Sequence, residues 1–325
     1  MKKHLLSFIV AICCTATLPL SAQNMFANMP TQIPETLPTE KSAQIVEQVA
    51  QSETSVFYMK DIVYEKRNDI ELTLQLLIPN TGDKDPKPCM VYIPGSAWFK
   101  QNVYMGIPNM IEFAKRGFVV AIMEYRHSGI APFPAQVIDT KNAIRFLRKN
   151  ADRFSVDSNN MFVWGDSSGG HTSLFAGITS DNPELDDPDF PDVPCTVNAI
   201  VAYYPPTDIS VLKDAPHAIS KGEASSPEGH LIGNRDISEN MDLARKASPN
   251  YYVKKEIPIP PVLLAAGMKD RVVPFVQTDL MAHCLAENGK IFEYYALKDA
   301  DHGSWQFWTP LMFDKVEAFV RKYIK

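Results

Sequence analysis

The chain has 325 residues, of which 45% are hydrophobic and 22% are charged. This is the composition of a globular protein, and it excludes collagen-like, coiled-coil and low-complexity architectures. The formal net charge is −6, and the sequence has no run of Lys and Arg, so neither a nucleic-acid nor an anionic-membrane partner is expected. A chain of this length can bury a core large enough to stabilise its fold without disulfides.

Residues 1–22 have the pattern of a secretory signal peptide. Two lysines near the start are followed by an apolar run from Leu5 to Leu20, and the small residues Ser21 and Ala22 end the segment. The run contains two threonines and a proline, which makes it a poor membrane span, although a retained anchor helix is the alternative. The paired cysteines in this run follow a bulky residue, which argues against lipid attachment. We therefore predict an exported protein, periplasmic or secreted, with no membrane span.

Residues 23–55 are rich in Pro, Thr and Gln and are interpreted as an N-terminal linker. From residue 56 to 325 the pattern predicts one α/β domain. Residues 56–65 and 70–78 alternate apolar and polar side chains, as an antiparallel pair of strands does. Residues 207–250 are rich in Gly, Ser, Pro and charged residues and interrupt the alternation of strands and helices in the later part of the chain. They are interpreted as an insertion over one end of the sheet.

Short apolar runs then alternate with helical stretches, which predicts a mostly parallel central sheet with helices on both faces. The predicted buried strands are Met90–Ile93, Val119–Glu124, Asn160–Trp164, Thr196–Tyr203, Val262–Ala266 and Phe292–Leu297. The predicted helices are Ile107–Arg116, Ala135–Asn150, Ser168–Thr179, Pro274–Asn288 and Thr309–Lys325.

A candidate nucleophile lies in the sequence Gly-Asp-Ser-Ser-Gly at residues 165–169. The motif follows a predicted strand and precedes a predicted helix, and this is the context in which a sharp turn exposes the central serine, Ser167. The two glycines leave room for the turn and for close helix–strand packing. Asp166, beside the serine, is interpreted as a hydrogen-bonding turn residue. An ordinary Gly/Ser turn is the alternative interpretation.

A nucleophilic serine needs a base, and the base needs a carboxylate to orient it. Asp270 and His302 each follow a predicted parallel strand, so both are expected at the same sheet edge as Ser167, in the chain order nucleophile, acid, base. His171 is a weaker base because its place on the same helix carries it away from Ser167. Asp301 adjoins His302 and is interpreted as a loop carboxylate.

Neither metals nor cofactors are predicted. Three cysteines follow the predicted signal peptide, namely Cys89, Cys195 and Cys284. An odd number cannot pair fully within one chain, and none has the spacing of a metal site. They are interpreted as small buried apolar side chains. The sequence contains no metal-ligand cluster and no dinucleotide fingerprint, so no cofactor is expected.

Several of these motifs, in this order, resemble the α/β-hydrolase superfamily. The resemblance runs from about residue 56 to the C-terminus, and is to the branch of hormone-sensitive-lipase-like and bacterial acetyl xylan and feruloyl esterase-like enzymes. The segments that carry it are Tyr92–Trp98, Glu124–Arg126 with Phe133–Ala135 and Asp139, Gly165–His171, Ala247–Pro249, Gly267–Pro274 and Asp301–Gly303.

The resemblance implies an oxyanion hole made by the backbone N–H groups of Ser96, Ala97 and Ser168. Relatives usually have His-Gly-Gly-Gly-Trp where this chain has Pro-Gly-Ser-Ala-Trp at residues 94–98. The added side chains are expected to narrow the hole or to favour small acyl groups. The insertion resembles a cap over the substrate pocket. Candidate apolar walls of that pocket are Trp98, Trp305 and Trp308, and a supporting ion pair is expected between Arg126 and Asp139.

The function predicted is hydrolysis of carboxylic esters through an acyl-enzyme. The resemblance implies small-molecule or polysaccharide-linked ester substrates, with acetyl and feruloyl groups as examples. Two alternatives stay open. A serine peptidase of the prolyl-oligopeptidase type shares the fold and chain order, but only residues 24–55 precede the hydrolase pattern. A non-catalytic binding protein would fit the altered oxyanion loop, but it need not keep Ser167, Asp270 and His302 together.

Overall fold

The computed structural model describes residues 55–212 and 222–325. The predicted signal peptide (1–22) and the predicted linker up to residue 54 lie outside the described residues, as does the segment 213–221 of the predicted insertion. None of the helices in the described part of the chain is long and apolar enough to span a membrane.

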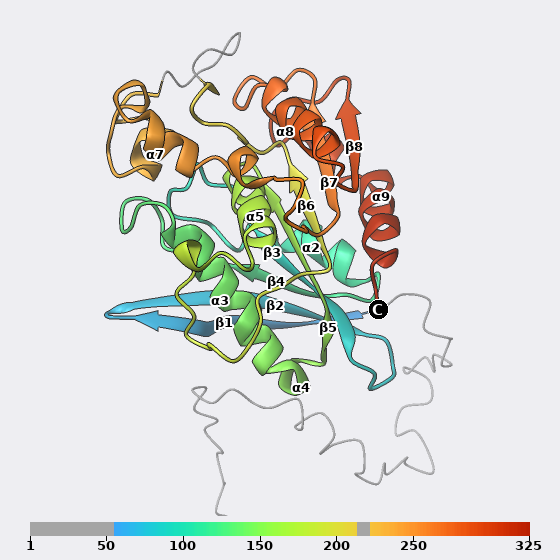
Figure 1. The fold of residues 1–325 in the computed structure, drawn as a ribbon. Coiled ribbons are helices and arrows are strands. Elements are labelled where there is room, and N and C mark those ends of the chain that lie inside the picture. Colours follow the sequence, from blue (N-terminus) through green and yellow to red (C-terminus); the bar gives the residue numbers. More distant parts are fainter. Residues whose placement is uncertain (1–54, 213–221) are drawn as a thin grey trace, which may run out of the picture. The chain divides into compact units, whose positions relative to one another are not determined.

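The described residues form an eight-stranded sheet in the order β1-β2-β4-β3-β5-β6-β7-β8 (Figure 1). The first two strands pair antiparallel, β2 pairs antiparallel with β4, and every later pair is parallel. The fold is therefore that of an α/β-hydrolase, as predicted. The strands are β1 Ser55–Arg67, β2 Ile70–Asn80, β3 Lys87–Ile93, β4 Val119–Met123, β5 Val156–Asp166, β6 Ala199–Tyr203, β7 Val262–Gly267 and β8 Phe292–Leu297.

The predicted strands are found with small differences at their ends. The antiparallel pair turns at Asn68, whose φ of 53° is a left-handed conformation that Asn tolerates. The strand predicted from Thr196 begins only at Ala199. The backbone before it is engaged elsewhere, since the carbonyl of Thr196 accepts a hydrogen bond from Arg148 Nη2 at 2.8 Å.

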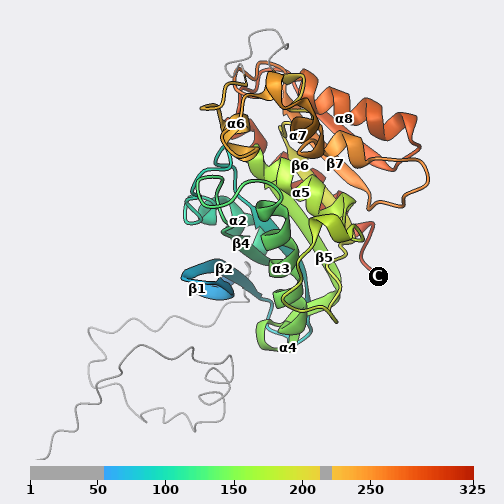
Figure 2. The same cartoon turned by 60° about the vertical axis from the view of Figure 1, so that its left-hand side comes forward.

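Helices cover both faces of the sheet. The helices α3 (Ala135–Lys149) and α5 (Ser168–Ile178) lie side by side on one face (Figures 1 and 2). On the other face lie α2 (Ile107–Ala114) and α9 (Pro310–Arg321). The remaining helices are α4 Ala151–Phe154, α6 Pro227–Leu231, α7 Met241–Lys246 and α8 Val276–Glu287, with short 3-10 turns at Pro183–Leu185, Ile237–Glu239, Pro249–Tyr252 and Trp305–Trp308.

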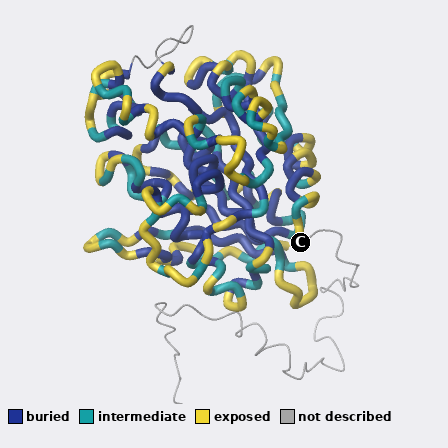
Figure 3. Tube along the Cα trace, viewed as in Figure 1, coloured by how far each residue is buried: buried dark blue, intermediate teal, exposed yellow. Residues whose placement is uncertain are grey.

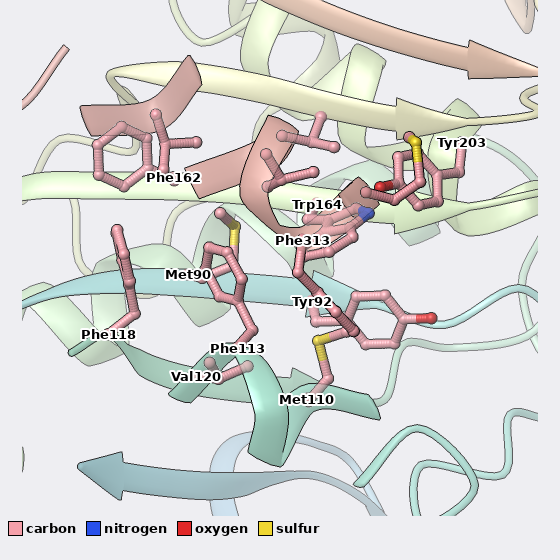
Figure 4. Packing of buried hydrophobic residues seen from close by; sticks show 14 of the residues in the cluster. Met90, Tyr92, Met110, Phe113, Phe118, Val120, Phe162, Trp164, Tyr203 and Phe313 are labelled. Carbon is pink, nitrogen blue, oxygen red and sulfur yellow. The ribbon is translucent and has the colours of Figure 1, made fainter. Parts of the chain in front are cut away.

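A large apolar core lies between the sheet and the α2–α9 face. Phe113 of α2 and Phe313 of α9 meet Trp164 of β5, with ring centroids 5.3 and 6.1 Å from the Trp164 ring (Figure 4). The middle strands are buried along their length (Figure 3), because helices cover them on both sides. This packing fixes the carboxyl ends of β3, β5, β7 and β8, and the loops that follow those ends carry the candidate site.

The described parts of the predicted insertion are residues 207–212 and 222–250, and residues 222–250 are called the cap below. Its helices α6 and α7 lie near each other (Figure 2) and enclose a small apolar cluster of their own. Members from the cap are Leu231, Ile232, Ile237, Ala244 and Ala247. Ile209 and Trp98 also belong to it, so the loop after β3 sends one large side chain into the core of the cap.

Candidate active site

Ser167 occupies a strained turn between β5 and α5. Its φ of 53° and ψ of −124° are unusual for a residue with a side chain, and such strain is found chiefly at functional sites. Two glycines make the turn possible. A Cβ on Gly165 would lie 2.1 Å from the carbonyl oxygen of Gly169, and one on Gly169 would lie 1.9 Å from that of Ile93. The motif therefore folds as its spacing predicts.

The structure brings Ser167, His302 and Asp270 together at the carboxyl edge of the sheet. Ser167 Oγ lies 2.9 Å from His302 Nε2, and His302 Nδ1 lies 2.8 Å from Asp270 Oδ2. The side chain of Asp270 is fully buried and that of His302 is 17% exposed. A base between a hydroxyl and a buried carboxylate is the arrangement that activates a serine.

The loops after β7 and β8 are held tightly against each other. The second oxygen of Asp270 accepts backbone hydrogen bonds from Val272 and Val273, at 2.9 and 2.8 Å, which orients the carboxylate. Asp301 instead pairs with Arg271 Nε at 2.6 Å and accepts a hydrogen bond from the backbone N–H of His302 at 2.8 Å. The hydrogen bond from Arg271 is the main reason that the pKa of Asp301 is lowered to about 2. Asp301 therefore joins the two loops, while Asp270 contacts the ring of His302.

Asp166 ties the turn to the loop after β3. Its half-buried carboxylate accepts hydrogen bonds from Tyr92 Oη at 2.6 Å and from the backbone of Gly95 at 2.9 Å. Burial raises the pKa of Asp166. Tyr204, which lies 3.4 Å from the same carboxylate, packs edge-on against His302 with ring centroids 4.7 Å apart. Asp166 thus supports the site through its neighbours.

The three predicted oxyanion donors are not equivalent. The N–H of Ser96 already donates to Ser168 Oγ at 2.9 Å. Ala97 and Ser168 line a cavity of about 270 Å³ together with Ser167. Ala97 and the following Trp98 have φ values of 54° and 56°, the left-handed region that a glycine would enter without strain. The candidate donors beside the nucleophile are therefore the amides of Ala97 and Ser168.

The cavity joins the nucleophile to the cap. Its other lining residues are Trp98, Pro206, Glu223, Ser225, Ser226, Pro227, Glu228, Val272 and Val273. Trp98 lines this cavity, whereas Trp305 and Trp308 do not. The side chain of Trp305 is 73% exposed, and Trp308 stacks on Trp164 in the main core with ring centroids 5.9 Å apart.

Other residues that the sequence singled out have structural contacts. Arg126 and Asp139 form the expected ion pair, with Nη2 and Oδ1 2.6 Å apart. Cys89 and Cys195 are buried thiols and Cys284 is partly buried, and all three are unpaired. Across residues 55–212 and 222–325 no group of three or more His, Cys, Asp or Glu side chains could hold a metal ion.

His171 has a connection that sequence reasoning missed. It was expected to be a packed helix side chain, and it is buried in α5. However, its Nδ1 accepts a hydrogen bond from Trp98 Nε1 at 3.2 Å, and its Nε2 lies 2.9 Å from the carbonyl oxygen of Ala247 in the cap. Burial lowers its pKa from 6.5 to about 4. The neutral ring therefore connects the cap, the loop after β3 and α5.

Known proteins resemble this chain in sequence and structure. Esterase LipC of Mycobacterium tuberculosis is 29% identical over 229 residues, which are 67% of this chain and 53% of LipC. A solved structure described as a truncated form of carbohydrate esterase from gut microbiota superposes with a TM-score of 0.75 at 26% identity, over 84% of this chain and 98% of that one. Propionate-bound esterase 2 of Thermogutta terrifontis has a TM-score of 0.64 at 22% identity, over 83% and 94%, and supports the fold alone.

The chain spans about half the length of the curated relatives it matches. The BD-FAE family model matches residues 74–285, a range that contains Ser167, Asp270 and the loop after β3 but ends before His302. Since that match covers more than half of the chain, the protein, an α/β-hydrolase by fold, belongs to the BD-FAE family.

Proposed function

We propose that this protein hydrolyses carboxylic esters, with Ser167 as nucleophile, His302 as general base and Asp270 as the carboxylate that orients it. The observation that carries the proposal is the continuous hydrogen-bonded chain from Ser167 Oγ through His302 to Asp270, with distances of 2.9 and 2.8 Å, beside a cavity. Membership of the BD-FAE family and the likeness to LipC support the same activity.

The reaction follows from this geometry. Ser167 Oγ attacks the carbonyl carbon of the ester while His302 Nε2 takes the hydroxyl proton, and Asp270 stabilises the imidazolium through Nδ1–H. The amides of Ala97 and Ser168 donate to the oxyanion, where one such donor is commonly worth about 3–4 kcal/mol of barrier. The tetrahedral intermediate collapses as the imidazolium gives its proton to the departing alcohol. A water molecule, deprotonated by His302, then releases the acid and restores Ser167.

The cavity supports substrates with a short acyl group and a polar alcohol. About 270 Å³ is small beside the range of roughly 300–1,000 Å³ that is usual for ligand pockets. Val272 and Val273 give the cavity apolar wall, whereas Ser225 and Ser226 of the cap are polar residues that also line it. Acylated saccharides combine a small acyl group with a hydroxyl-rich alcohol. The carbohydrate esterase that resembles this chain supports this substrate class.

The decisive experiment compares the wild-type chain with Ser167→Ala. We expect the variant to lose several orders of magnitude in turnover of p-nitrophenyl acetate and to lose labelling by a fluorophosphonate, while its circular dichroism is unchanged. Retention of most activity would contradict the mechanism. A panel of acetyl, butyryl and feruloyl esters and acetylated xylan then defines the acyl group. Faster cleavage of aminoacyl-proline amides than of these esters would instead favour a peptidase.

The N-terminal segment supports action outside the cytoplasm. We assign residues 1–22 as a signal peptide, 23–55 as a linker and 56–325 as the hydrolase domain with its cap, on the sequence pattern described above. Expression of the full chain in a bacterial host, followed by N-terminal sequencing of the exported protein, should show a new terminus at Gln23. A full-length chain held in the membrane fraction would contradict this assignment.

A further inference from the structure

The loop after β3 places two strained residues beside the nucleophile. Ala97 and Trp98 are consecutive non-glycine residues at φ values of 54° and 56°. Conformations of this kind cost free energy, so they persist only where the surrounding structure holds them. The contacts on either side of Ala97 therefore decide whether its amide stays beside Ser167.

The first of these contacts lies before Ala97. The N–H of Ser96 donates to Ser168 Oγ at 2.9 Å, and the hydroxyl of Ser96 lies 2.7 Å from the carbonyl oxygen of Phe99 and 3.0 Å from Tyr125 Oη. These bonds attach the start of the loop to the first residue of α5.

The second contact lies after Ala97. Trp98 is only 2% exposed and packs in the apolar cluster of the cap. Its Nε1–H donates to His171 Nδ1 at 3.2 Å, and the two rings meet edge to face with centroids 4.9 Å apart. His171 can accept this bond only if its proton is on Nε2, where the carbonyl oxygen of Ala247 lies 2.9 Å away. The cap thereby selects the tautomer that accepts from Trp98.

We propose that His171 is a positioning residue of the ester-hydrolysing site: by accepting a hydrogen bond from Trp98, it fixes the amide of Ala97 where the oxyanion develops. His171 does not line the cavity and touches no reacting atom. It acts through Trp98, which does line the cavity. The inference rests on the proposed function, because it assigns the Ala97 amide to oxyanion binding.

Two substitutions at position 171 separate the two hydrogen bonds of the imidazole ring, one with Trp98 and one with Ala247. The amide of His171→Gln reaches the place of Nε2 and can donate to Ala247, but it leaves Trp98 without its acceptor. The shorter His171→Asn places an oxygen near the position of Nδ1, so it keeps the bond to Trp98 and loses the bond to the cap. The pair is therefore a matched test of which bond matters for catalysis.

We expect His171→Gln to lower kcat for p-nitrophenyl acetate by roughly ten- to a hundredfold with little change in KM, since a misplaced oxyanion donor weakens transition-state binding. His171→Asn should keep kcat within about threefold of the wild type, because a retained bond leaves transition-state binding nearly intact. The rate of fluorophosphonate labelling should follow the same order. Equal kcat values for wild type and His171→Gln, or equal losses in both variants, would overturn the proposal.

Trp98→Phe provides an independent variant, because it removes the indole N–H and keeps an aromatic ring in the cap cluster. It should reproduce the loss of kcat, and adding His171→Gln to it should cost little more, since both changes remove one bond. If His171→Gln fails to fold, Trp98→Phe alone decides, and an unchanged kcat there refutes the role of the bond. Inactivity of the wild type toward all esters and toward the fluorophosphonate would instead refute the proposed function.

Discussion

The neutral state of His171 should make the stability of the protein depend on pH. The ring is 1% exposed and both nitrogens are engaged in the form that carries one proton. A second proton would have to sit on Nδ1, where it would face the N–H of the buried Trp98. Burial accordingly lowers the pKa of His171 from 6.5 to about 4.

The sign and size of the effect follow from proton linkage. Between pH 6.5 and about 4 the unfolded chain carries a proton on His171 and the folded chain does not. Acid therefore favours the unfolded state, and the free energy of unfolding falls by about 1.4 kcal/mol for each pH unit lost within this window. Over the whole window the loss is about 3 kcal/mol, a large share of the roughly 5–15 kcal/mol that stabilises a typical domain.

The loss can be measured by urea unfolding, followed by circular dichroism, in half-unit steps from pH 7 to pH 4.5. The free energy of unfolding of the wild type is compared at each pH with that of His171→Asn. Other titrating groups are common to both proteins and cancel in the difference. One of them is Glu65, where burial raises the pKa from 4.5 to about 7. Its effect on the pH dependence of stability has the opposite sign to that of His171. The raised pKa of Glu65 stabilises the folded state fully below pH 4.5, and this stabilisation is lost as the pH rises toward 7. Parallel stability curves for wild type and His171→Asn would refute the neutral, doubly bonded ring.

Three further substitutions test the site and the core. Asp270→Asn should lower kcat by about four orders of magnitude while circular dichroism stays unchanged, because the amide favours the wrong imidazole tautomer. Ala97→Gly should relieve the strain at φ 54° and raise the rate with butyryl relative to acetyl esters, as an ester panel would show. Phe113→Ala should lower the free energy of unfolding by about 3–5 kcal/mol in urea titrations with no change in KM.

The sequence predicted the strands and the three candidate catalytic side chains for the same physical reason. Strands buried on both faces leave uninterrupted apolar runs, and in a parallel sheet the loops that follow them meet at one edge. Ser167 and Asp270 each follow such a run, whereas His302 follows the edge strand β8, whose residues are mostly only half-buried. The order of β4 and β3 in the sheet could not be predicted in this way, because apolar runs do not specify which strands pair.

Other features of the site depend on side-chain directions that no pattern contains. The hydroxyl of Ser168 engages the amide of Ser96, so one of the predicted oxyanion donors is already occupied. Trp305 and Trp308 lie in the same 3-10 turn, yet one is exposed and the other stacks in the core. The role of His171 could not be predicted from the sequence, because it depends on how the loop after β3 and the cap come together at α5.

The departures of residues 94–98 from the glycine-rich pattern of similar enzymes have a common physical basis. Gly95 is retained where no side chain fits, since a Cβ there would lie 2.7 Å from the backbone oxygen and 2.8 Å from the carboxylate of Asp166. Ala97 requires only a left-handed backbone conformation. The free-energy cost of that conformation can be offset by contacts from neighbouring segments. Ser168 and His171 provide such contacts on its two sides. This chain therefore has a loop that is held by outside contacts, and we expect its proposed oxyanion donors to depend on those contacts more than the donors of a glycine-rich loop would.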